Sequence, residues 1–222
     1  MRASLRPGEY TERVSFSLWL SLLTACVVIS FTPGAGAINT MSNALASGWR
    51  RSIWGVVGQQ IALIIHVLIV AAGVGVFVAR SPLLFTTIRY VGAAYLIYLG
   101  LRMALSRPKV ADSAAAVGVV PRVTNRAMLL RGLWVNLLNP KAIVFFLAFI
   151  PQFVRLDEPQ LPQYLVLAAT AVVVDVLVMW FFFAAAARPF GRFAGTVRGQ
   201  RVLNGVFGAL FVLVAALLLV IH

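Results

Sequence analysis

Two proline-containing segments and one acidic residue interrupt a sequence that is otherwise strongly apolar. The first segment reads Thr32-Pro33-Gly34 and the second reads Asn139-Pro140-Lys141. A proline inside a helix removes one backbone hydrogen bond and pushes against the preceding turn. Lipid cannot satisfy the carbonyl groups that are freed, so such a break survives only where protein or a water-filled cavity covers it. One break is often only a kink, but two matching breaks predict a polar site near the middle of a membrane.

Polar residues and glycines adjoin both breaks. Glycine lets a ligand approach the backbone closely. The N-terminus of a half-helix carries partial positive charge that suits a carboxylate, whereas exposed carbonyl groups suit an ammonium group. The predicted solute-binding residues are Thr32, Pro33, Gly34, Gly36, Asn39, Asn136, Asn139, Pro140 and Lys141.

Asp175 is the acidic residue, and it lies in the middle of an apolar run. A charge at that depth costs about 2.5–3 kcal/mol on insertion scales, so an intramembrane carboxylate indicates function. We expect Asp175 to accept a proton or to pair with the ammonium group of a substrate. A static ion pair with Lys141 is the alternative, and it would offset the cost of both charges. The two interpretations are compatible if the pair opens during transport.

Gln59 and His66 are secondary candidates. They are seven residues apart in one apolar run and so share roughly one helix face. Gln59 or its neighbour Gln60 would face a cavity, although an interhelical hydrogen bond explains either residue equally well. A lone histidine among aliphatic residues is more often a buried hydrogen-bonding residue than a proton relay.

The composition indicates the elements that must position these residues. The chain is 61% hydrophobic and 11% charged, whereas an average globular chain has roughly 25% charged residues. About 20 helical residues cross a bilayer core of about 30 Å, and the period-2 alternation of a membrane barrel is missing. We therefore expect an all-α integral membrane protein with six transmembrane helices. The predicted spans are 16–36 with a continuation to 48, 53–79, 83–105, 128–154, 163–187 and 202–221.

The two halves of the chain resemble each other. A polar connector at about 106–126 separates repeat one, about 14–105, from repeat two, about 127–221, within a single transmembrane domain covering 1–222. Spans one and four are each broken at a proline. Gly92 in span three and Gly205 in span six occupy corresponding positions. Because three is odd, the second copy of a three-helix unit must be inverted, as in many transporters. Chance similarity between apolar helices is the alternative.

The net charge of +13 would suggest nucleic acid on a soluble protein. Here the basic residues flank apolar runs, so we expect no nucleic-acid partner. Twelve lie on the side of the loops between spans one and two, three and four, and five and six, and six lie on the other side. The excess of basic residues places those three loops in the cytoplasm and both termini in the periplasm.

Motifs of membrane-embedded enzymes are missing from the sequence. It contains no His-Glu-x-x-His pair, no paired carboxylates in one span, no Gly-x-Ser-x-Gly elbow and no phosphate-binding loop. We predict no metal and no cofactor. Transport is the favoured interpretation, while a membrane-embedded enzyme and a non-transporting membrane subunit remain open alternatives.

The two proline segments, 31–41 and 135–145, together resemble the LysE/RhtB family of amino-acid exporters, most closely the homoserine/homoserine lactone efflux branch. The similarity covers nearly the whole chain, including 92–100, 149–153, 173–179 and 207–211. It implies export of a small neutral amino acid or derivative, such as homoserine, threonine or homoserine lactone, across the bacterial inner membrane by proton antiport. The family usually has Pro-Gly-Pro and then an acidic or polar residue, where this chain has Pro33-Gly34-Ala35-Gly36. The expected partners are the substrate, protons and lipid, with a homodimer possible through glycine-rich faces.

Overall fold

The computed structural model describes residues 7–77, 81–106, 123–155, 158–194 and 196–220. This described part is almost entirely helical and contains no strand, as predicted. Most of the predicted connector, 107–122, lies outside the described residues. The elements are α1 (Pro7–Phe31), α2 (Ala35–Ser47), α3 (Trp49–Phe77), α4 (Pro82–Ala104), α5 (Asn125–Leu137), α6 (Pro140–Phe149), η1 (Ile150–Phe153), α7 (Gln160–Val176), η2 (Leu177–Ala184), α8 (Ala187–Ala194) and α9 (Val197–Val220).

Both predicted helix breaks are present, and they have nearly the same geometry. The chain bends by 56° between α1 and α2 and by 55° between α5 and α6. Pro140 is the first residue of α6, where its missing N–H breaks no helical hydrogen bond. The Asn139 side chain caps α6 by accepting from the Lys141 N–H at 3.1 Å. Gly34 precedes α2 and supplies no side-chain cap, so the start of α2 keeps free N–H groups.

Fewer than six segments meet the length and hydropathy expected of a membrane span. Within the described residues, three helices qualify: Trp49–Gly73, Gln160–Ala184 and Val197–Val220. Each bent pair adds one more if it is counted as a single span, which gives up to five. The predicted third span coincides with α4, which is 23 residues long but is not among these segments. A sixth crossing through α4 therefore stays a prediction.

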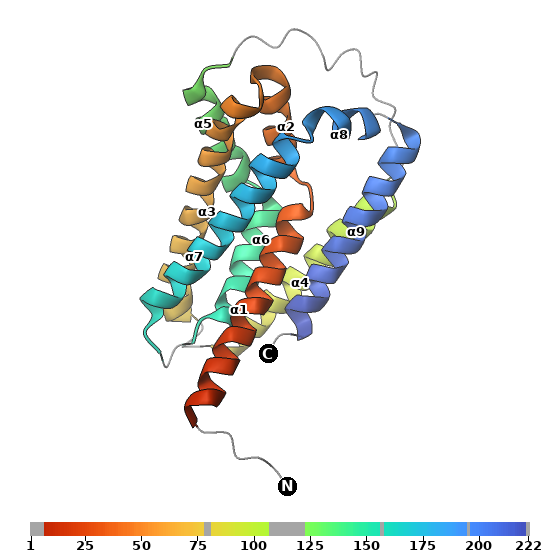
Figure 1. Ribbon diagram of the computed structural model, residues 1–222. Coiled ribbons are helices and arrows are strands. Elements are labelled where there is room, and N and C mark those ends of the chain that lie inside the picture. Colours follow the sequence, from red (N-terminus) through yellow and green to blue (C-terminus); the bar gives the residue numbers. More distant parts are fainter. Residues whose placement is uncertain (1–6, 78–80, 107–122, 156–157, 195, 221–222) are drawn as a thin grey trace.

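Helices α4 and α9 lie side by side and run in opposite directions (Figure 1). A Cβ atom added to Gly100 would lie 2.7 Å from the Gly208 carbonyl oxygen, and one added to Gly208 would lie 2.7 Å from that of Gly100. Such close approach requires small residues at the crossing. The buried Arg89 of α4 donates to the carbonyls of Leu218, at 2.9 Å, and Leu219, so it caps the last turn of α9.

Helices α3 and α5 also meet backbone to backbone. A Cβ on Gly58 would lie 2.0 Å from the Leu129 carbonyl oxygen, and a Cβ on Gly132 would lie 2.0 Å from that of Gly55. Because α3 and α5 come from different halves of the chain, these glycines fix the contact between the two halves.

A π-helical segment, η2, continues α7 and begins two residues after Asp175. This π-helical segment was not predicted from the sequence, and π-helical turns are frequent at functional sites. The rings of Trp49 and Trp180 stack at 4.6 Å with an interplanar angle of 3°. Each indole N–H donates to the other residue's carbonyl, at 2.9 and 3.1 Å. This contact ties the corner between α2 and α3 to η2.

The bundle has two distinct ends (Figure 1). The α2–α8 end holds the last turn of α2, the first turns of α3 and α5, and the short helix α8, which was not predicted. The α1–α7 end holds the first turns of α1 and α7 and the last turn of α9. Helix α1 begins and α9 finishes at the same end, as expected if both termini share one side of the membrane. That this side is the periplasm stays a prediction.

Candidate functional site

A cavity of about 50 Å³ lies between the two helix breaks. One water molecule needs about 10–15 Å³ of cavity volume, so this cavity has room for only a few water molecules. The polar side chains that line it come from both halves of the chain; they are Ser30, Gln59, Asn136, Asn139, Lys141 and Asp175. The apolar lining includes Cys26, Ile29, Leu63, Phe145, Phe146 and Met179. The cavity is therefore small, and polar side chains project into it between largely apolar walls.

Lys141 reaches from the second break to the first. Its ammonium group donates to the carbonyls of Ile29, at 3.0 Å, and Thr32, at 2.5 Å, where α1 ends. A cation is favourable there, because the last carbonyls of a helix are unpaired and carry partial negative charge. A Cβ on Gly34 would lie 3.5 Å from Lys141 Cε, so the lysine side chain passes directly over this glycine. Lys141, from the second half of the chain, thus caps the C-terminal end of α1 in the first half.

Asp175 is held by two neutral donors. Gln60 Nε2 donates to its Oδ2 at 2.7 Å, and the Ser30 hydroxyl donates to its Oδ1 at 3.1 Å. Asp175 and Lys141 line the same cavity, but no ion pair joins them in the described part of the chain. The static ion pair considered from the sequence is therefore not formed in this conformation. The two ionisable side chains each have hydrogen-bond partners of their own.

Gln59 belongs to the site, although the sequence made it only a secondary candidate. Its side-chain N–H group donates to the Gly36 carbonyl at 3.1 Å and to the Thr40 hydroxyl at 3.0 Å. The Asn136 side-chain amide in turn donates to the backbone carbonyl of Gln59 at 3.0 Å. A Cβ on Gly36 would lie 3.3 Å from Gln59 Oε1, so only glycine fits here comfortably. These contacts fasten both breaks to α3.

Four predicted residues, with Gly34 among them, shape the breaks without lining the cavity. The hydroxyl of the buried Thr32, the residue after α1, donates to the Val28 carbonyl in the last turn of α1 at 2.8 Å. Pro33 is buried, whereas Pro140 is exposed at the start of α6. Their roles are in the backbone, not in direct contact with the cavity.

Two other predicted residues lie behind the cavity wall. Asn39 is 2% exposed and faces α3. His66 is 6% exposed, and its ring stacks on Phe146 at 5.5 Å, so one aromatic layer separates it from the cavity.

Ser30 and Gln60 contact Asp175 but are not among the site residues predicted from the sequence. Both donate to Asp175. The sequence does not decide whether Gln59 or the adjacent Gln60 faces inward. Ser30 carries a weaker signal: it is a polar residue just before the first break.

A second cavity, of about 240 Å³, lies at the α1–α7 end. Leu22 and Leu167 line it, and each lies one helical turn from a residue that lines the first cavity, Cys26 on α1 and Ala171 on α7. The two cavities therefore follow one another along the contact between α1 and α7.

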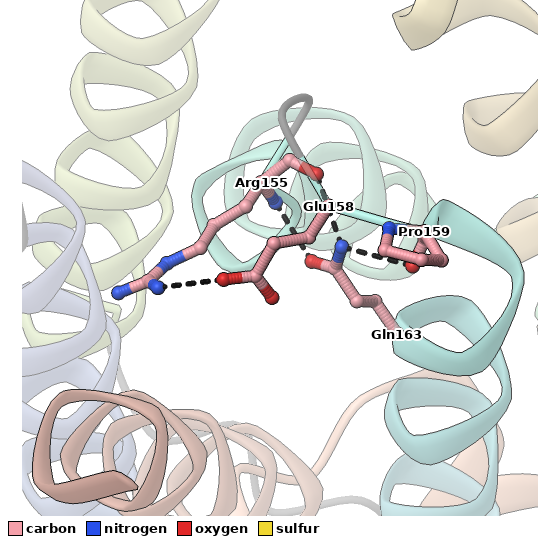
Figure 2. Close-up of polar contacts among 4 residues, drawn as sticks. All are labelled: Arg155, Glu158, Pro159 and Gln163. Carbon is pink, nitrogen blue, oxygen red and sulfur yellow. Dashed lines mark hydrogen bonds and ion pairs between the residues drawn. The ribbon is translucent and has the colours of Figure 1, made fainter. Parts of the chain in front are cut away.

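Three polar residues, Arg155, Glu158 and Gln163, line the second cavity, and Figure 2 shows the contacts among them. The Arg155 guanidinium pairs with the Glu158 carboxylate at 2.9 Å. The Gln163 side chain accepts from the Arg155 N–H at 2.7 Å and donates to its carbonyl at 3.0 Å and to that of Pro159 at 3.1 Å. Arg155 and Pro159 are thereby anchored to Gln163 in the first turn of α7.

The chain is similar to known proteins over most of its length. Residues 27–221 match the model of the LysE type translocator family. The chain is 38% identical over 209 residues to the homoserine/homoserine lactone efflux protein of Salmonella typhimurium, covering 92% of this chain and 97% of the relative. It is 37% identical over 194 residues to an uncharacterized membrane protein of Vibrio cholerae, covering 87% and 92%. It is 28% identical over 214 residues to the leucine efflux protein of an Enterobacter species, covering 96% and 100%.

No solved structure matches the chain. The family and its named members are transporters, which excludes the membrane-embedded enzyme left open by the sequence. A family match over most of the length, supported by relatives above 30% identity, identifies the chain as a member of the LysE family of translocators.

Proposed function

We propose that this protein exports a small neutral amino acid or derivative, of the homoserine, threonine or homoserine lactone class, across the bacterial inner membrane in exchange for protons. One observation carries the proposal: Lys141 and Asp175 line one cavity between two broken helices and form no ion pair with each other in the described part of the chain. An amino acid carries both a carboxylate and an ammonium group, so it matches this pair of charges. The relative named a homoserine/homoserine lactone efflux protein supports the substrate class.

The carboxylate side of the site is formed where α1 ends and α2 begins. Lys141 uses two donors on carbonyl groups, and an ammonium group has three. The first N–H groups of α2, next to Gly34, have no side-chain cap, and a helix N-terminus attracts negative charge. A substrate carboxylate, or the carbonyl of a lactone, would bind between them.

The ammonium side of the site is Asp175, which also couples transport to protons in this mechanism. A substrate ammonium group would bind the ionised carboxylate. When a proton enters from outside and neutralises Asp175, that attraction is lost and the substrate leaves. Gln60 and Ser30 hold the carboxyl group in place in both states.

Alternating access by two inverted three-helix repeats fits the packing. The two bends differ by only 1°, from 56° to 55°. Gly100 and Gly208, which contact each other reciprocally, are 108 positions apart, close to the 107 that separate the two prolines. The pair suggested by the sequence fits less well, because a Cβ on Gly92 would meet Ala148 and one on Gly205 would meet nothing within 4 Å.

In the proposed mechanism the conformation seen here is the one that excludes the solute, and we call it closed. A cavity of about 50 Å³ is far smaller than the roughly 300–1,000 Å³ of small-molecule sites, so the helices must separate to admit solute. The cavity of about 240 Å³ at the α1–α7 end would then be the outward exit. Leu22 and Leu167 would then close the route between the two cavities.

The substitution Asp175→Asn tests the proposal. Gln60 Oε1 has no hydrogen-bond partner among the described residues, so the Gln60 amide can turn over and accept from the new amide N–H. Removal of a charge from the membrane adds no cost. The free energy of unfolding should therefore fall by no more than about 1 kcal/mol.

Efflux of homoserine, threonine and homoserine lactone is measured in proteoliposomes with an imposed pH gradient. The wild type should export at least one of them faster with the gradient, and Asp175→Asn should abolish this acceleration. An undiminished response in the variant would remove Asp175 from the mechanism. Failure of the wild type to move any of the three would refute the substrate class.

A further inference from the structure

One face of α2 carries buried polar groups that have no hydrogen-bond partner within the described residues. The orphan atoms are both side-chain polar atoms of Asn39, Nδ2 of Asn43 and Oγ of Ser47. The two asparagines are each only 2% exposed. Because these three residues are four positions apart, they lie one above another on the same helix face. We call this row the α2 polar face.

The α2 polar face is turned toward α3. A Cβ added to Gly55 would lie 2.3 Å from Asn43 Nδ2 and 3.5 Å from Asn39 Nδ2, so the two amides pack on this glycine. On the same helix, Ile38 is 63% exposed and Leu45 is 55% exposed. Apolar residues of α2 thus point outward, while its unpaired amides are covered by protein.

The row connects the central cavity with the α2–α8 end of the bundle. Gly36 lines the cavity, and its carbonyl shares the Gln59 amide with Thr40, one turn further along α2. From there the row continues through Asn39 and Asn43 to Ser47, the last residue of α2, at the end of the bundle (Figure 1). Polar groups therefore extend from the cavity to the surface on one helix.

Unpaired buried amides are costly, because they lose their hydrogen bonds to water and gain none in return. Leucine has nearly the same shape as asparagine and would fill the same space without that cost. The presence of amides at Asn39 and Asn43 is explained if these side chains gain hydrogen-bond partners in another conformation, in which α2 and α3 have moved apart.

We propose that the α2 polar face is a second, inner binding site, at which a small hydrogen-bonding solute contacts Asn39, Asn43 and Ser47 on its way to the central cavity. The inference rests on the proposed function, because it gives the exported solute its route from the α2–α8 end. The site recognises hydroxyl, amino and carbonyl groups, and it contains no charged side chain.

Cysteine labelling tests access to this face. The natural Cys26 lines the central cavity, so it is first replaced by alanine and the transport of that background is measured. Asn43→Cys is then compared with Leu45→Cys, which lies on the exposed apolar side of the same helix. A charged, water-soluble thiol reagent is applied to the α2–α8 side of membrane vesicles.

Asn43→Cys should react although asparagine is buried in the closed conformation, and millimolar homoserine should slow the reaction at least threefold. Leu45→Cys should stay unreactive in lipid. No reaction at Asn43→Cys would overturn the proposal, and so would a reaction that homoserine does not slow, because the face would then admit water only.

The substitution Asn43→Leu provides a second, independent measurement. If Asn43 is only a packing residue, leucine should raise the thermal stability and leave transport unchanged. If it binds solute, stability should be unchanged or higher while transport falls about tenfold, the effect of losing one hydrogen bond to the solute. Unchanged transport in a folded variant would refute the inner site; if the variant does not fold, the cysteine measurement decides.

These outcomes separate the two proposals. A wild type that exports none of the tested compounds contradicts the proposed function. A wild type that exports homoserine, together with an inert and unprotected position 43, contradicts the inner site alone.

Discussion

The substitution Gly132→Ala should separate helices that must stay in contact. The added Cβ would lie 2.0 Å from the Gly55 carbonyl oxygen, whereas ordinary contact begins at 3.4 Å, so α3 and α5 must move apart by about 1.4 Å. Overpacking of this kind costs roughly 1–3 kcal/mol. The atom that the new Cβ meets belongs to the backbone of Gly55, so no side chain can rotate away to relieve the clash. We therefore expect an overpacking cost near 3 kcal/mol. Alanine regains about 1 kcal/mol of helix propensity, which leaves a net loss of about 2 kcal/mol.

The same displacement should disturb the candidate site. Asn136 lies one turn beyond Gly132, and its amide donates to the Gln59 carbonyl at 3.0 Å. A separation of more than 1 Å would break this bond, and both residues line the central cavity. Transport by Gly132→Ala should therefore fall together with its stability.

Gly205→Ala is the matched control, because a Cβ at Gly205 would meet nothing within 4 Å. It should keep transport and gain about 0.5–1 kcal/mol, the usual advantage of alanine over glycine inside a helix. Unfolding in mixed detergent micelles gives the free energies, and homoserine efflux from proteoliposomes gives the activity. Equal stability and equal transport for Gly132→Ala and the wild type would refute the backbone-to-backbone contact between α3 and α5.

Two further predictions concern the charge at the first break and the orientation of the chain. Lys141→Met leaves the carbonyls of Ile29 and Thr32 without their donor, so we expect about 1–3 kcal/mol lower stability and loss of efflux. Micelle unfolding and the efflux assay would check this, and normal efflux would exclude Lys141 as a substrate ligand. An alkaline phosphatase fused after His222 should be active, because we expect the C-terminus in the periplasm; an inactive but stable fusion would reverse the orientation.

The sequence alone predicted much of this protein because a membrane imposes strict local rules. Apolar runs of about 20 residues must form helices, since lipid leaves no other way to satisfy the backbone. Pro33 and Pro140 marked the two breaks for the same reason, and their position relative to one another pointed to one shared site. Asp175 and Lys141 were recognisable because charges at such depth are costly.

Partners across the bundle could not be predicted, since they depend on how each helix is rotated. Whether Gln59 or Gln60 faces Asp175 is a matter of 100° about α3, and the sequence contains no information at that resolution. The π-helical segment after Asp175 was also unforeseen, because its residues are apolar and compatible with an ordinary α-helix.

The amino-acid sequence by itself thus determined that the chain is a helical membrane protein, where two of its helices break and which ionisable residues lie inside apolar runs. Only the tertiary structure decided that Lys141 caps α1 instead of pairing with Asp175, and that Asn39 and Asn43 face α3 without partners. The physical reason is that burial in lipid depends on local composition, whereas each hydrogen bond depends on the distance and rotation of helices far apart in the chain.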